Sequence, residues 1–360
     1  MPAEWEHHEA TWIAWPHNRS DWPGKFGPIP WVYAEIVRHL SRSERVGILV
    51  NDEASEANAR QVLVRAAVLA ENALEPGTRA GNVEFVRIPT NRAWTRDYGP
   101  IFVKRKSSGK KNLPTLAATA WRFNAWAKYD DWKLDAPVSA ELARRLRVPA
   151  WQPEVELNGK PHRVVLEGGS IDVNGRGTLI TTEECLLSDV QARNPGMTRE
   201  QLEQVFSDFL GVKKVIWLGR GIAGDDTHGH VDDITRFVAP DTVLTAYEDD
   251  PADGNHAPLK ENFRKLTLST DQSGKPLRVI KLPMPSPVIF RGRRLPASYA
   301  NFYIANRSVL MPVFNDPRDR IALNTLARVL PGRDIVGIYC GDFIWGLGAL
   351  HCMTQQQPAT

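Results

Sequence analysis

Histidines and carboxylates alternate in one short segment, residues 225–233, which reads Asp-Asp-Thr-His-Gly-His-Val-Asp-Asp. Alternate side chains of a strand point to the same face, so we expect His228, His230 and Asp232 to face one site. Three interpretations are open for such a group. A histidine beside a carboxylate can act as a general acid and base, and a His-x-His pair with a carboxylate can hold zinc. The segment can also be a polar strand end without chemistry.

A second candidate lies near the end of the sequence, where Cys352 follows the glycine-rich stretch 345–351. Glycine at 346 and 348 allows the backbone to come close to a ligand. A single cysteine after such a loop, beside His351 and a polar Thr-Gln-Gln run, is a candidate nucleophile. Cys185 and Cys340 stand in apolar, strand-like contexts, and we expect them to be buried as small hydrophobic side chains.

Two further motifs place a carboxylate beside a turn. Asp97 follows Trp94 and Arg96 and precedes a Gly-Pro step, and Glu167 precedes two glycines. Taken alone, the Arg-Asp step could be a structural ion pair and the Glu-Gly-Gly step an ordinary turn.

The elements that must position these residues alternate between helices and short strands rich in β-branched residues. Helices are predicted over 31–43, 53–72, 137–146, 198–210, 258–269 and 317–330. Strands are predicted over 46–50, 83–88, 100–103, 115–121, 164–166, 171–173, 178–182, 214–218, 234–238, 242–245, 277–281, 301–305, 308–312 and 335–339. This alternation predicts an α/β fold. Frequent hairpins argue against a purely parallel sheet, and a unit of paired strands plus a helix recurs roughly five times, which favours a closed arrangement of similar units.

The amino-acid composition of the chain argues against membrane-spanning, secreted and nucleic-acid-binding proteins. The 360 residues are 42% hydrophobic and 24% charged, as in an ordinary globular protein. No run approaches about 18 apolar residues, so no membrane helix is expected, and no signal peptide is visible. Three cysteines cannot form a disulfide framework, which predicts a reducing, cytoplasmic setting. A net charge of +3 is too small to indicate nucleic acid, and the basic run 104–111 is interpreted as a solvated loop between strands.

Together the motifs resemble the guanidino-group-modifying, or pentein, superfamily, and within it the agmatine deiminases, a peptidyl-arginine deiminase-like family. The resemblance covers almost the whole chain. It rests on 1–6, 12–16, 94–97 with 99–100, 124–126, 167–169, 229–232, 298–303 and 351–356. It implies a single catalytic domain, residues 1–360, folded as a five-bladed, pseudo-symmetric α/β-propeller with the active site on its central axis.

The resemblance also implies catalytic roles. Cys352 is the nucleophile, Asp97 and Asp232 bind the guanidinium, His230 is the acid and base, and Glu167 orients that histidine. The implied reaction converts agmatine and water to N-carbamoylputrescine and ammonia, in a cytoplasmic enzyme of polyamine synthesis. It requires no metal or organic cofactor, because the substrate itself carries the charge.

The predicted substrate-binding residues are Trp94, Arg96, Trp126, Asp226, His228 and Gly348. Asp226, without a balancing cation, would attract the ammonium of agmatine and repel the carboxylate of arginine. His228 stands where many of these enzymes have asparagine, so an arginine derivative or a peptidyl arginine remains an alternative substrate. A metal-dependent hydrolase and a non-catalytic pentein binding module are remoter alternatives. The expected partner is a small guanidino molecule, without nucleic acid or membrane, and a homo-oligomer is compatible with the sequence.

Overall fold

The computed structural model describes residues 1–70, 81–105 and 115–360. The end of the predicted helix 53–72 and most of the basic run 104–111 lie outside these residues. In the described part of the chain, no helix combines the length and the apolar character needed to cross a membrane.

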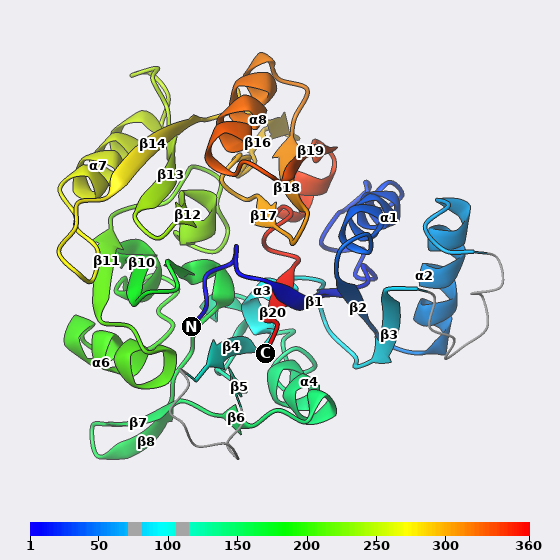
Figure 1. Ribbon diagram of the computed structural model, residues 1–360, viewed down its shortest axis with the longest axis horizontal. Coiled ribbons are helices and arrows are strands. Elements are labelled where there is room, and N and C mark those ends of the chain that lie inside the picture. Colours follow the sequence, from blue (N-terminus) through cyan, green and yellow to red (C-terminus); the bar gives the residue numbers. More distant parts are fainter. Residues whose placement is uncertain (71–80, 106–114) are drawn as a thin grey trace.

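The fold is mixed α/β, and within the described ranges five sheets share one pairing pattern. In each, a strand pairs antiparallel with one neighbour and parallel with the other, and the parallel strands are joined through a helix. In spatial order these sheets are β20(Gln355–Pro358)-β1(His8–Ala14)-β2(Arg45–Val50)-β3(Val83–Arg87), β4(Ile101–Lys104)-β5(Leu116–Thr119)-β6(Ala150–Trp151), β9(Asp172–Val173)-β10(Thr178–Thr182)-β11(Lys214–Leu218), β12(Thr235–Ala239)-β13(Thr242–Tyr247)-β14(Arg278–Pro283) and β17(Tyr303–Ile304)-β18(Ser308–Val313)-β19(Asp334–Tyr339). The sheets surround a centre near which both chain ends lie (Figure 1).

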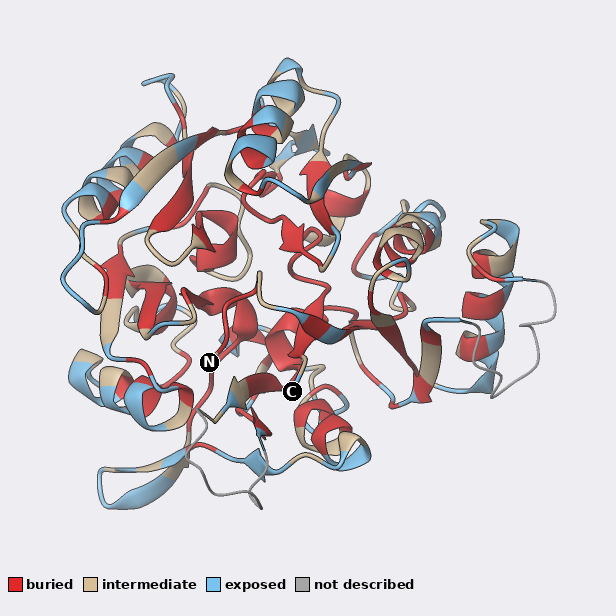
Figure 2. Ribbon diagram, in the orientation of Figure 1, coloured by how far each residue is buried: buried red, intermediate tan, exposed pale blue. Residues whose placement is uncertain are grey.

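Helices connect the parallel strands. They are α1(Ile29–Leu40), α2(Glu53–Arg65), α4(Val138–Leu146), α5(Glu183–Leu186), α6(Arg199–Leu210), α7(His256–Thr267) and α8(Pro317–Val329). The hairpins β7(Glu154–Leu157)-β8(Lys160–Arg163) and β15(Ile289–Phe290)-β16(Arg293–Arg294) lie outside this pattern. The helices turn their exposed faces outward, and the inner strands are buried (Figure 2).

Most predicted elements are present because their local signals agree with the fold. Helix α6 begins with a capping box in which Thr198 and Gln201 satisfy each other's backbone N–H, and it ends at Gly211 in a left-handed conformation. Strands β10 and β11 have the predicted bounds, and every residue of β10 is buried. The predicted strand 164–166 is reduced to a single bridge between Val165 and Arg122.

The strand expected over His228–Asp232 is wrong. His228 and Gly229 both have positive φ, 62° and 94°, which no strand accommodates. The Asp225 carboxylate accepts the backbone N–H groups of Thr227 and Gly229 and closes the chain into a turn. The next residues form the short 3₁₀ helix η4(Val231–Asp233). The side chains of this segment therefore do not alternate as in a strand.

The centre of the molecule contains a buried cluster of charges. Arg236, fully buried on β12, lies 2.5 Å from the Asp172 carboxylate and 2.8 Å from that of Glu4, and donates to the Phe302 carbonyl. Arg96 and His351 contact the same Glu4 oxygen, Oε2, as Arg236 does. Buried charges of this kind are tolerated only when they are paired, so each member depends on the others.

Replacing Arg236 with methionine should strongly destabilise the protein. The change leaves the Asp172 carboxylate buried without its cation, and breaking a buried ion pair costs about 3–5 kcal/mol in free energy of unfolding. Urea denaturation followed by circular dichroism measures the effect. Arg264→Gln is the matched control, because Arg264 forms an exposed pair with Glu261. Equal midpoints for the two variants would contradict a structural role of the cluster.

Candidate active site

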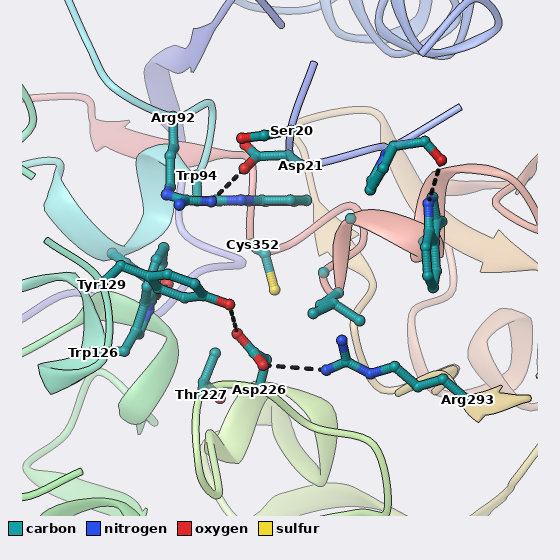
Figure 3. A pocket seen from close by; sticks show the side chains of 16 residues that line it. Ser20, Asp21, Arg92, Trp94, Trp126, Tyr129, Asp226, Thr227, Arg293 and Cys352 are labelled. Atoms are coloured by element: carbon teal, nitrogen blue, oxygen red, sulfur yellow. Dashed lines mark hydrogen bonds and ion pairs between the residues drawn. The ribbon is translucent and has the colours of Figure 1, made fainter. Parts of the chain in front are cut away.

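A cavity of about 370 Å³ lies between loops that come from several of the sheets. Its lining includes Ser20, Asp21, Arg92, Trp94, Asp97, Trp126, Tyr129, Asp226, Thr227, Arg293, Gly348 and Cys352. The Cys352 thiol points into the space between Trp94 and Asp226 (Figure 3). The predicted nucleophile, one predicted guanidinium carboxylate and the predicted tail residues Trp94, Trp126, Asp226 and Gly348 therefore share one cavity.

Cys352 lies on the loop between η5(Phe343–Gly346) and β20 and is 5% exposed. The Asn301 side-chain amide holds this loop: Nδ2 lies 3.0 Å from the Cys352 sulfur, and Oδ1 accepts the backbone N–H groups of His351 and Cys352. A Cβ at Gly348 would approach the Trp94 ring to 2.9 Å and the Cys352 Cβ to 3.1 Å, so glycine is required there by close packing. The loop fixes the thiol in the cavity wall.

The environment of the Cys352 thiol disfavours its ionised form. Burial raises its pKa well above the usual value, and the carboxylates of Asp232, Asp233 and Asp97 raise it further. The Asp232 carboxylate lies 3.6 Å from the sulfur. A cation bound among these groups would reverse the effect by compensating the carboxylates.

His230 is fully buried, with its two ring nitrogens facing different partners. Nε2 lies 3.4 Å from the Glu167 carboxylate, while Nδ1 lies 3.8 Å from Asp97 and 3.9 Å from Asp232. Burial alone would lower the pKa of His230, but Asp97 and Glu167, among other neighbours, raise it well above the usual value. A Cβ at Gly169 would come within 2.6 Å of Nδ1, so this glycine of the Glu-Gly-Gly motif leaves room for the ring.

Asp97 and Asp232 present carboxylates to the same ring nitrogen of this histidine, Nδ1. Asp97, on the single-turn helix α3(Thr95–Tyr98), accepts from the Trp126 indole N–H at 2.9 Å and from the backbone of Gly169 at 3.1 Å. Burial raises the pKa of Asp97 to about 6, with further contributions from Asp232 and Glu167 opposed by His230. Burial acts in the same direction on Asp232, but His351 and His230 outweigh it and lower its pKa.

Three residues that support this site were not assigned from the sequence. The His351 ring lies between two carboxylates. Its Nδ1 is 2.7 Å from the Asp232 carboxylate and its Nε2 is 2.8 Å from the Glu4 carboxylate. Arg193, fully buried, donates through Nε to both Glu167 oxygens at 3.1 and 3.2 Å. Asn301 holds the cysteine loop. His351 and Asn301 lie within the family motifs, and this position could have identified them as site residues. Arg193 lies in no motif, so nothing in the sequence pointed to it.

Asp226 lines the cavity, and the structure supplies the balancing cations whose absence would let it repel a carboxylate. Its carboxylate accepts from Lys128 Nζ at 2.5 Å, from the Tyr129 hydroxyl at 2.5 Å and from Arg293 Nη2 at 3.2 Å. Figure 3 shows Tyr129 and Arg293 reaching this carboxylate from opposite sides. The charge of Asp226 is therefore compensated by Lys128 and Arg293, two cations that are distant from it in sequence.

Arg96 and His228, expected to bind substrate, do not line the cavity. The Arg96 guanidinium lies behind it and donates to the His351 carbonyl, to Gln356 and to Glu4. The His228 ring lies 3.1 Å from the Ser188 hydroxyl. The turn at 225–229 directs His228 away from His230 and Asp232, so the prediction that the three share a face is corrected.

Two groups of possible metal ligands occur among the described residues. They are Glu167, Cys185 and His230, and Asp232, Asp233 and Cys352, each with ligand atoms within 4.8 Å of one another. His228 belongs to neither, so the zinc set suggested by the His-x-His motif is not assembled. Cys185 is buried in an apolar cluster, as expected, and its sulfur also lies close to the His230–Glu167 pair.

The chain is similar to known proteins over its full length. A family model described as Porphyromonas-type peptidyl-arginine deiminase matches residues 1–358. Agmatine deiminase of Medicago truncatula is 36% identical over 387 residues, covering 100% of this chain and 96% of the relative. The solved agmatine deiminase of Enterococcus faecalis, described as catalysing its reaction, superimposes with a TM-score of 0.85 at 30% identity, covering 99% and 95% of the two chains. A C. jejuni agmatine deiminase with substrate bound gives 0.81 at 28% identity, with the same coverage.

Proposed function

The chain belongs to the Porphyromonas-type peptidyl-arginine deiminase family, and from this premise we propose that it hydrolyses agmatine to N-carbamoylputrescine and ammonia. The observation that carries the proposal is that Asp97 and Cys352 line one cavity, while the buried His230 and Asp232 lie directly against them. The agmatine deiminases to which the chain is similar act on this class of guanidino substrate.

The reaction begins with the guanidinium. Its carbon is a poor electrophile because its charge is delocalised, and carboxylates that accept its N–H groups in pairs orient it for attack. Asp97 and Asp232 are the proposed acceptors, and the bound cation stabilises the Cys352 thiolate that the same carboxylates otherwise disfavour. Binding and activation of the nucleophile are thereby coupled.

As the guanidinium binds, the Cys352 thiol loses its proton to solvent. The thiolate then attacks the central carbon, and a carbon–sulfur bond forms. His230 donates its proton to one amino nitrogen, the carbon–nitrogen bond breaks and ammonia leaves, so that a covalent S-alkylthiouronium remains. His230, now neutral, removes a proton from a water molecule that attacks the same carbon. The carbon–sulfur bond breaks, the ureido product leaves and Cys352 is regenerated. Glu167, held by Arg193, keeps the imidazole ring in place throughout.

The finer architecture is also part of the proposal. The five sheets with one pairing pattern are interpreted as five blades of a pseudo-symmetric propeller, within a single domain of residues 1–360. The pairing of β20 with β1 joins the two ends of the chain and supports a closed ring. Under this interpretation the cavity lies on the central axis. The cytoplasmic location and a homo-oligomeric state stay predictions.

We expect kcat/KM for agmatine to fall as pH decreases through about 6 and to rise above neutral pH. Asp97, with a pKa of about 6, must be ionised to bind the guanidinium, and protonation below that value removes the acceptor. The raised pKa of Cys352 also favours higher pH, whereas the raised pKa of His230 keeps its proton available there. A pH–rate profile of steady-state ammonia release measures this. A maximum below pH 6 would be incompatible with these roles.

The direct test of the function is product analysis. Purified protein is incubated with agmatine, and ammonia and the ureido product are quantified. We expect equal amounts of ammonia and N-carbamoylputrescine. Failure to release ammonia from agmatine, arginine or an arginyl peptide would instead favour the non-catalytic binding alternative. Loss of ammonia release after chelation, with recovery on adding zinc, would favour the metal-dependent alternative.

A further inference from the structure

The Asn301 side chain, fully buried just before β17, touches the reacting sulfur with a nitrogen whose identity its other contacts fix. The Asn301 Oδ1 lies 2.9 Å from the backbone nitrogen of His351 and 3.3 Å from that of Cys352, and both of these groups donate an N–H. An amide nitrogen cannot accept them, so Nδ2 is the atom that faces the Cys352 sulfur at 3.0 Å. Because this nitrogen only donates, the contact is an N–H···S hydrogen bond.

The backbone around Asn301 is held rigidly. Arg236 donates through Nη1 to the carbonyl oxygens of Phe302, at 2.6 Å, and of Ala300, at 3.5 Å. The backbone carbonyl of Asn301 in turn accepts the N–H of His351 at 3.2 Å. The amide is therefore already in place before the reaction and needs no reorganisation when negative charge develops on the sulfur.

The other hydrogen of the Asn301 amide nitrogen serves a carboxylate. Nδ2 lies 2.9 Å from Asp233 Oδ1, so the same nitrogen bridges this carboxylate and the Cys352 sulfur. Asp233 is one of the carboxylates that raise the pKa of the Cys352 thiol. Of the side chains that the structure describes, Asn301 is the one that donates a hydrogen bond to this sulfur. Its partly positive hydrogens oppose the repulsion that a thiolate would meet there.

We propose that Asn301 is a catalytic residue, whose amide N–H stabilises the Cys352 thiolate for attack on the guanidino carbon. The inference rests on the proposed function, in which the sulfur reacts as a thiolate. A hydrogen bond to a charged acceptor is roughly twice as strong as one to a neutral acceptor, so the amide favours the thiolate over the thiol. It acts alongside the cationic substrate and is present before the substrate binds.

The two ends of the amide can be tested separately. The oxygen holds the cysteine loop through the backbone of His351 and Cys352, whereas the nitrogen contacts the sulfur and Asp233. A purely structural role of Asn301 needs the oxygen alone. A catalytic role needs the nitrogen as well.

The reactivity of the sulfur can be measured without any substrate. Cys352 lines the cavity of about 370 Å³, and its thiol points into open space (Figure 3), where a small alkylating reagent can reach it. Cys185 and Cys340 are fully buried and protected from such a reagent. Because the thiolate is the reactive form, the alkylation rate at a fixed pH below the titration midpoint is proportional to the thiolate fraction.

The test measures alkylation of Cys352 by iodoacetamide in substrate-free wild type and Asn301→Asp, with mass spectrometry of the peptide that contains Cys352. The variant keeps an acceptor oxygen for the loop and replaces the donor nitrogen with oxygen. We expect the alkylation rate to fall about tenfold or more, because losing a hydrogen bond to a charged group corresponds to about one to two pH units of thiol titration. The kcat for agmatine should fall similarly, with little change in KM, since Asn301 does not line the cavity.

Asn306→Asp is the matched control, because it makes the same chemical change at an amide that bonds to the backbone of His8. It should leave the alkylation rate and kcat unchanged. Asn301→Leu is the second variant, which keeps the volume, removes both ends of the amide and places no charge beside Asp233. It decides the question if thermal unfolding shows that Asn301→Asp does not fold.

The outcomes separate this inference from the proposed function. A wild-type alkylation rate in either folded variant of Asn301 would overturn the inference and leave the proposed function intact. Wild-type protein that releases no ammonia from agmatine would refute the proposed function. The alkylation rates would still show in that case whether the amide stabilises the thiolate.

Discussion

Cys352→Ala abolishes ammonia release from agmatine while leaving the fold intact, if the proposed chemistry is correct. Cys352 supplies the one thiol among the described residues that line the cavity, and without it no carbon–sulfur bond can form. Removing one sulfur atom from a loop held by Asn301 should change the melting temperature little. Ammonia release and thermal unfolding measure the two effects separately.

The three cysteines provide the control for this prediction. Cys340 is fully buried in the core, and burial alone raises the pKa of its thiol, so Cys340→Ala should lose some stability and remain active. The sequence led to the same expectation for Cys185, but its position beside His230 and Glu167 makes it unsuitable as a neutral control. An active Cys352→Ala enzyme would refute the nucleophile assignment.

The second large effect is expected at the two aspartates. Asp97→Asn and Asp232→Asn keep the side-chain shape but replace an acceptor oxygen with a donor facing the N–H groups of the guanidinium. Leaving a buried cation without its partner costs about 3–5 kcal/mol, a factor of roughly 150 to 5,000 in kcat/KM. Steady-state kinetics with agmatine measure the loss.

The alternative that Asp97 is a structural ion pair is disfavoured by its contacts. Its carboxylate accepts from Trp126 and Gly169, while Arg96 reaches Glu4 and Arg92 reaches Asp21 and Asp131. Asp334→Asn is a suitable control, because Asp334 forms an exposed pair with Arg307. A loss below about tenfold for both Asp97→Asn and Asp232→Asn would mean that these carboxylates do not bind the reacting group.

The sequence predicted the elements whose local signals are complete. Helix α6 has a capping box at its start and glycine at its end, and β10 and β11 are short apolar runs between turns. The alternation rule failed for His228 because it assumes an extended backbone. The backbone has positive φ at His228 and Gly229 instead. The glycine in the sequence was not by itself enough to predict this turn.

The candidate site was predictable where its members stand in family motifs. Cys352, His230, Asp97, Asp232 and Glu167 were assigned from such motifs, and the structure brings their side chains together. The charged contacts of Asp226 were not predictable, because Lys128 and Arg293 are 98 and 67 residues from it in the sequence. Surface lysines and arginines are common, and only tertiary structure shows which of them meet a buried carboxylate.

The most direct measurement of the central claim is mass spectrometry of the wild-type protein quenched in acid during turnover of agmatine, followed by proteolysis. Covalent catalysis by Cys352 predicts a substrate-derived thiouronium on the peptide that contains this residue, absent from Cys352→Ala and from protein quenched after the substrate is exhausted. Steady turnover with an unmodified Cys352 peptide and an adduct on another residue would contradict the claim.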